Sequence, residues 1–111
     1  MAGIEMSAGA GKLVRDRIPQ IIRDEGAEPV TYVAGPREYR ARLREKLREE
    51  VAELLDADEE SAPGELADVA EVLLALAADL GLSSEQLEAI RLAKAGERGG
   101  FAGRIVWMGN R

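Results

Sequence analysis

Four acidic side chains form two pairs in the middle of the chain. Glu50 and Glu53 are the first pair, and Glu65 and Asp68 are the second, after eleven intervening residues. The three-residue spacing within each pair places both carboxylates on one face of a helix. Four oxygen ligands from two facing helices can hold one or more Mg²⁺ ions, which keep some waters and bridge substrate phosphates. The pattern therefore predicts an Mg²⁺ site, with Mn²⁺ as the alternative ion.

The composition restricts which chemistry the chain can perform. Its 111 residues include no Cys and no His, which excludes disulfides, Cys nucleophiles, Ser-His-Asp triads and the usual zinc ligands. The formal net charge of -6 argues against binding a nucleic-acid polymer or an anionic membrane, because both need clustered Lys and Arg. An anionic ligand would therefore need a metal to bring it in.

The balance of residue types is typical of a soluble globular protein, with 46% hydrophobic and 32% charged residues. No apolar run reaches membrane-spanning length without an acidic residue, and residues 1–11 lack the features of a secretory signal. We expect a cytoplasmic protein with a flexible tail at residues 1–11 and a single domain at residues 12–111.

Two long helices are predicted to position the acidic pairs. The first, from about residue 36 to residue 56, has apolar residues every three or four positions, and the second, from Glu65 to Leu82, is apolar around most of its circumference. The acidic stretch 56–64 is a short connection, so the helices should be antiparallel neighbours. The end of the first then faces the start of the second, and the four carboxylates converge.

Ordinary explanations also exist for these acids. Glu65 follows Pro63-Gly64 in a first helical turn, where negative charge suits the helix dipole. Many Glu side chains in a helix rich in Arg and Glu are surface charges. Asp68, however, lies deeper than capping explains, and a carboxylate on an enclosed face needs a positive partner. Glu71, one turn further on, is either an outer ligand or an exposed acid.

Shorter elements complete the predicted fold. A short helix starts at Pro19, and a third helix is capped by Ser83 or Ser84 and ends before Gly99. Lys94 and Arg98 lie one turn apart on that helix, so both can point at one spot. Segments 30–33 and 104–108 are rich in β-forming residues and are expected to pair as two strands. The expected class is mainly α with this small β element.

Four sequence motifs carry a family resemblance: KLVRDRIP at 12–19, EEVAE at 49–53, ELADV at 65–69 and KAGERGGF at 94–101. In this order they resemble the MazG-like all-α nucleotide pyrophosphohydrolases, in particular the small group similar to phosphoribosyl-ATP pyrophosphohydrolase. The resemblance covers nearly everything from Lys12 to Trp107. It implies a helical bundle completed by homo-oligomerisation. It also implies cleavage between the α and β phosphates of a nucleoside triphosphate or related nucleotide, as in cleaning of the nucleotide pool.

The resemblance also implies roles for individual residues. The magnesium ligands would be Glu50, Glu53, Glu65 and Asp68, and Glu49 would orient a water. Phosphate and substrate contacts would come from Lys94, Arg98, Lys12, Arg15 and Arg17. Composition alone instead favours a solvated face with local ion pairs for the last three cations.

Two alternatives remain open at the level of the sequence. Within the same enzyme class, the chain could be phosphoribosyl-ATP pyrophosphohydrolase of histidine biosynthesis. From another class, it could be a non-catalytic helical interaction module whose acids are surface charges or a structural ion site, because a fold does not certify activity. Either way we expect a homodimer or larger assembly, since one long and one short helix cannot cover the apolar circumference of residues 65–82.

Overall fold

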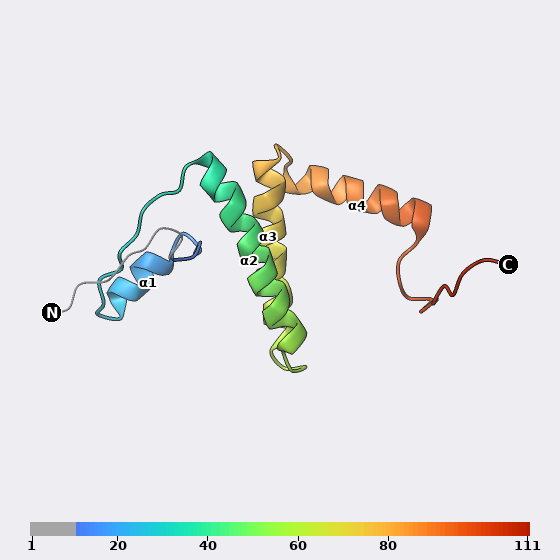
Figure 1. Ribbon diagram of the computed structural model, residues 1–111, viewed down its shortest axis with the longest axis horizontal. Coiled ribbons are helices and arrows are strands. Elements are labelled where there is room, and N and C mark those ends of the chain that lie inside the picture. Colours follow the sequence, from blue (N-terminus) through green and yellow to red (C-terminus); the bar gives the residue numbers. More distant parts are fainter. Residues whose placement is uncertain (1–10) are drawn as a thin grey trace. The chain divides into compact units, whose positions relative to one another are not determined.

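Helices form where the apolar periodicity predicts them. The computed structural model describes residues 11–111 and contains, within this range, four helices and no strand. The helices are α1 (Ile18–Asp24), α2 (Pro36–Asp56), α3 (Ala62–Asp79) and α4 (Ser84–Arg98) (Figure 1). The mainly helical class is confirmed. None of these four helices combines the length and apolar character needed to cross a membrane.

The chain divides into two compact units, one ending at Leu76 and the other formed by Ala77–Arg111. The first unit contains α1, α2 and most of α3, and the second contains the end of α3, α4 and the C-terminal segment. The predicted tail at residues 1–11 lies outside the described residues except for Gly11. The single domain over residues 12–111 stays a prediction.

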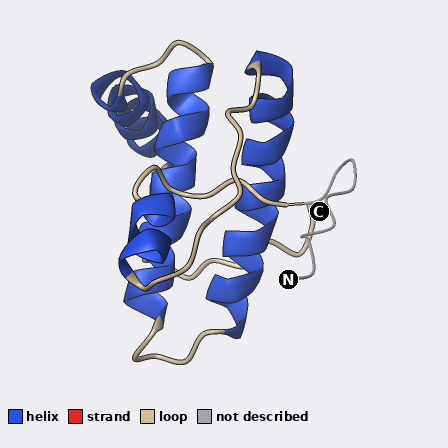
Figure 2. Ribbon diagram, turned by 90° about the vertical axis from the view of Figure 1, so that its left-hand side faces the viewer, coloured by secondary structure: helices blue, strands red, loops and turns tan. Residues whose placement is uncertain are grey.

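The long helices α2 and α3 are antiparallel neighbours: α2 lies in front of α3 in Figure 1, and the turned view of Figure 2 separates the two. Pro36 occupies the first turn of α2, where no backbone N–H is needed. Before α3, the Asp58 carboxylate accepts hydrogen bonds of 2.8 Å from the backbone N–H and the hydroxyl of Ser61. Helix α3 begins at Ala62, three residues before the predicted start at Glu65. Pro63 is tolerated there because the first turn has no acceptor for its missing N–H.

The interior of the first unit is small. Leu43 of α2 is 2% exposed and Val72 of α3 is 8% exposed. On the same helix, Leu66 and Leu73 remain 56% and 44% exposed. The first unit therefore leaves part of the apolar circumference of α3 uncovered.

The second unit shows the predicted helix boundaries. Gly81 has a φ of 83°, and the N–H of Leu82 donates to the Ala77 carbonyl at 2.8 Å, which closes α3 in the geometry that favours glycine. Ser83 caps α4: its hydroxyl accepts from the N–H of Gln86, whose side chain accepts in return from the N–H of Ser83. Of the two predicted caps, Ser83 is the one used.

The predicted pairing of segments 30–33 and 104–108 is wrong, because neither is a strand. Arg104 has a φ of 54°, a left-handed conformation that a strand does not accommodate. Val33 is 97% exposed and Ile105 is 91% exposed. β-forming residues make a strand only when their side chains and backbone find a partner to pack against, and these segments have exposed side chains instead.

Candidate functional site

Three of the four predicted metal ligands form a cluster between α2 and α3. Glu50, Glu65 and Asp68 each offer one carboxylate oxygen, and these oxygens lie within 4.8 Å of one another. Glu50 lies near the end of α2, and the other two lie in the first turns of α3. The short connection between the antiparallel helices thus brings these three acids together.

Two oxygens of this cluster are buried with no hydrogen-bond partner in the described part of the chain: Glu50 Oε2 and Glu65 Oε2. Glu50 as a residue is only 8% exposed. Leaving a buried charged oxygen unsatisfied costs about 1–3 kcal/mol or more, and a bound cation removes this cost. Because all the donors are hard carboxylate oxygens, the residues fit Mg²⁺ or Mn²⁺.

Glu53, the fourth predicted ligand, lies beside the cluster. The charge of Glu50 raises the pKa of Glu53, and desolvation and the charges of Glu65 and Glu49 act in the same direction. The side chain is exposed and lines a cavity next to the cluster. Glu53 is therefore placed to add a ligand at the edge of the three-carboxylate cluster.

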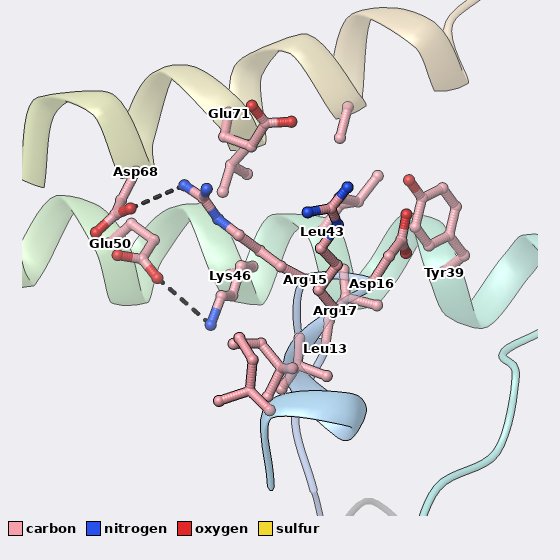
Figure 3. A pocket seen from close by; sticks show the side chains of 15 residues that line it. Leu13, Arg15, Asp16, Arg17, Tyr39, Leu43, Lys46, Glu50, Asp68 and Glu71 are labelled. Carbon is pink, nitrogen blue, oxygen red and sulfur yellow. Dashed lines mark hydrogen bonds and ion pairs between the residues drawn. The ribbon is translucent and has the colours of Figure 1, made fainter. Parts of the chain in front are cut away.

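Two cations contact carboxylates of the cluster directly. Arg15 Nη2 lies 2.8 Å from Asp68 Oδ1, and Lys46 Nζ lies 3.4 Å from Glu50 Oε1 (Figure 3). The partner of Arg15 is 53 residues away in sequence, so its ion pair joins the N-terminal segment to α3. Arg15 is thus more than a surface charge with a local partner.

Glu49 lies among lysines rather than in the carboxylate cluster. Lys12 Nζ and Lys46 Nζ are each 3.4 Å from one of its carboxylate oxygens. Burial raises the pKa of Glu49, but the charges and hydrogen bonds of the two lysines outweigh burial, so that the pKa is lowered. Glu49 is therefore held in its ionised form, and its role in orienting a water stays a prediction.

Lys46 is the site residue that sequence reasoning missed. Its side chain is 16% exposed, and Lys46 lines two cavities that adjoin the acidic cluster. The available signal was its position three residues before Glu49 and four before Glu50, which allows an ion pair with each on one helix face.

Two cavities adjoin the acidic cluster, and Glu50 and Asp68 line both. The larger has a volume of about 530 Å³ and extends over the face of α2 and α3 toward Asp16, Arg17 and Tyr39 (Figure 3). The smaller has a volume of about 270 Å³. Its charged lining consists of Lys12, Arg15, Lys46, Glu50, Glu53 and Asp68.

Arg42 holds the N-terminal segment against α2. Its Nη1 donates to the Gly11 carbonyl at 2.9 Å, while its Nε pairs with Glu38 at 3.2 Å. The side chain is 10% exposed. This contact fixes the start of the segment that carries Lys12 and Arg15.

The remaining predicted cations are in different places. Arg17 and the acid Glu71 line the larger cavity. Lys94 and Arg98 lie on α4 in the second unit, one turn apart and both exposed. Their contact with phosphate stays a prediction.

Comparison with known proteins finds similarity over part of the chain. No protein-family model matches the chain, and no solved structure matches it. The chain is similar to an uncharacterized protein of Mycolicibacterium smegmatis (strain ATCC 700084 / mc(2)155), with 53% identity over 51 residues. This match covers 46% of the chain and 52% of that protein. The chain thus spans about half the length of this relative, whose description assigns no activity.

Proposed function

We propose that the chain is an Mg²⁺-dependent nucleotide pyrophosphohydrolase, which cleaves the α-β phosphate bond of a nucleoside triphosphate or related nucleotide and releases pyrophosphate. The observation that carries the proposal is the cluster of Glu50, Glu65 and Asp68, with two buried oxygens that lack a partner in the described chain. Cations beside this cluster suit a phosphate substrate. The four motifs that resemble the MazG-like enzymes support the same reaction.

Glu50, Glu65 and Asp68 would hold the metal, with Glu53 as a further ligand. When bound, Mg²⁺ neutralises phosphate oxygens and lowers the pKa of a water. Glu49, kept ionised by Lys12 and Lys46, would orient the attacking water through a hydrogen bond.

The other charged groups bind the substrate. Arg15 and Arg17 line the larger cavity, which offers room for the nucleotide between the N-terminal segment and the two long helices. Lys12, Lys94 and Arg98 are further proposed contacts with phosphate. Because in-line attack by water needs no covalent intermediate, a chain without His or Cys can perform the reaction.

The test is release of pyrophosphate from a panel of nucleoside triphosphates and from phosphoribosyl-ATP, with Mg²⁺, with Mn²⁺ and with a chelator. We expect turnover only with a divalent metal, and the preferred substrate distinguishes pool cleaning from a role in histidine biosynthesis. Glu50→Gln should abolish turnover, whereas Glu59→Gln, an exposed acid in the turn before α3, should retain it. Absence of turnover on every substrate would favour the non-catalytic interaction module.

A further inference from the structure

The charged groups around the smaller cavity suggest a second binding role. Three cations, Lys12, Arg15 and Lys46, share its lining with three carboxylates. We propose that these cations form a polyphosphate subsite, and that Arg15 and Lys46 become available to it by exchange. In the metal-free protein they neutralise Asp68 and Glu50, and they turn to the phosphates when a metal takes those carboxylates. The inference rests on the proposed function and specifies the part of the substrate that these cations bind.

The first step is competition for the same carboxylates. Arg15 and Lys46 hold Asp68 and Glu50 at 2.8 Å and 3.4 Å, and both acids belong to the cluster that suits a metal. A divalent cation at this cluster would repel the charged side chains of Arg15 and Lys46. It would also withdraw electron density from the carboxylate oxygens that they contact. Metal binding therefore weakens both ion pairs.

The second step is the freedom of the cations to move. The Arg15 side chain is 54% exposed, and long Lys and Arg side chains change rotamer without moving the backbone. Lys46 is more buried, with 16% of its side chain exposed, but it lines both cavities. Each cation can therefore exchange a carboxylate for a ligand in the adjacent cavity.

The third step is charge balance. The three carboxylates and three cations that line the smaller cavity balance in formal charge, and a divalent metal adds positive charge. A diphosphate group offers several anionic oxygens, each able to accept a charge-assisted hydrogen bond from guanidinium or ammonium. The metal-loaded cavity therefore favours the polyphosphate part of a nucleotide or the pyrophosphate product.

If the cations exchange partners in this way, substitutions of Lys46 or Arg15 should change the affinity for the metal and the affinity for pyrophosphate in opposite directions. Removing the charge of Lys46 or Arg15 removes a competitor of the metal and also removes a donor to phosphate. Lys46→Met and Arg15→Met should therefore bind Mn²⁺ more tightly than the parent and bind pyrophosphate about tenfold more weakly. A purely structural role would not change the two affinities in opposite directions.

Titration calorimetry on the full chain tests the exchange, first with Mn²⁺ alone and then with inorganic pyrophosphate at a fixed, saturating free Mn²⁺ concentration. Arg48→Met is the matched control, because this substitution removes the same charge. Arg48 is exposed on α2 and lines neither cavity. We expect its two affinities to stay near those of the parent. Arg15→Met is the variant less prone to a folding defect, since 54% of the Arg15 side chain is exposed, against 16% for Lys46.

Two results would overturn the inference: variants at Lys46 and Arg15 that behave like Arg48→Met, or variants that bind Mn²⁺ more weakly. The second result would mean that the cations position the carboxylates for the metal. A parent protein that binds no divalent cation would contradict the proposed function as well. If the parent binds the metal but Lys46→Met and Arg15→Met both keep its pyrophosphate affinity, only the proposed exchange is contradicted.

Discussion

The carboxylate of Glu53 lies in the field of neighbouring acids, with Glu50 as the largest influence, and this field raises the pKa of Glu53. An acid whose pKa is raised by folding destabilises the folded state when it is ionised at neutral pH. Glu53→Gln should therefore raise the melting temperature of the metal-free protein, while abolishing metal-dependent hydrolysis. Scanning calorimetry in a chelator and a pyrophosphate assay measure the two effects. Glu59→Gln serves as control, and an unchanged or lower melting temperature for Glu53→Gln would argue against repulsion within the cluster.

Lys94 and Arg98 on α4 are the residues for which the family resemblance predicts contact with phosphate. Because they are expected to meet phosphate rather than the metal, Lys94→Ala and Arg98→Ala should weaken nucleotide binding or turnover more than metal binding. Arg91→Ala is a control on the same helix, since Arg91 is paired with Glu88. Calorimetry with Mn²⁺ and with a nucleotide separates the two effects, and a larger loss of metal affinity would contradict the assignment.

At the scale of single residues, the convergence of Glu50, Glu65 and Asp68 could be predicted, because helical spacing and a short turn determine which side chains face each other. The ion pair between Arg15 and Asp68 could not, since it depends on the path of the N-terminal segment across α3. Lys46 was overlooked because local spacing shows which acids it can reach but not how deeply it is buried.

At the scale of elements, the loop before α2 is attached to that helix by Tyr32, Glu38 and Arg42. The Tyr32 hydroxyl donates to Glu38, and this hydrogen bond, aided by Arg42 and opposed by desolvation, lowers the pKa of Glu38. A carboxylate with a lowered pKa stabilises the fold above its unfolded pKa, and this stability is lost as the pH falls through the folded pKa.

Glu38→Gln should therefore be less stable than the parent at neutral pH, and the two stabilities should converge in acid. Urea unfolding at a series of pH values between about 7 and about 3 measures the difference. Glu59→Gln, in an exposed turn, should follow the pH dependence of the parent. If the stabilities of Glu38→Gln and the parent differed by the same amount at every pH, the link between the pKa of Glu38 and stability would be contradicted.

The helices and their ends could largely be predicted, because apolar periodicity, Pro36, Gly81 and Ser83 act locally. The predicted start of α3 at Glu65 is three residues late, because Pro63-Gly64 suggests a boundary whereas proline fits a first helical turn. The prediction of two strands, at 30–33 and 104–108, is wrong for a different reason. Residues that favour β structure form a strand only when they have a partner to pack against.

At the scale of the whole molecule, α3 presents apolar side chains to solvent: Leu66, Leu73 and Leu74 are 56%, 44% and 41% exposed. A monomer rarely leaves such a surface uncovered, whereas a second copy of the chain can bury it symmetrically. We expect a homodimer or larger assembly, which Leu73→Glu should dissociate. Sedimentation at low micromolar concentration tests this expectation.

Val33→Glu is the control for assembly, because Val33 is 97% exposed in the loop before α2 and should not affect the contact. A well-folded parent monomer of 12.0 kDa would contradict the expectation. An assembled and folded Leu73→Glu variant would contradict the placement of the contact on α3.

The most direct test of the central claim is the identity of the products. ³¹P NMR of a nucleoside triphosphate incubated with the protein and Mg²⁺ should show nucleoside monophosphate and pyrophosphate appearing in equal amounts. The signals should be absent with a chelator and with Glu50→Gln, whose parent side chain carries the buried unpartnered oxygen Oε2. Formation of nucleoside diphosphate and inorganic phosphate, or pyrophosphate release that persists without a metal, would contradict the account.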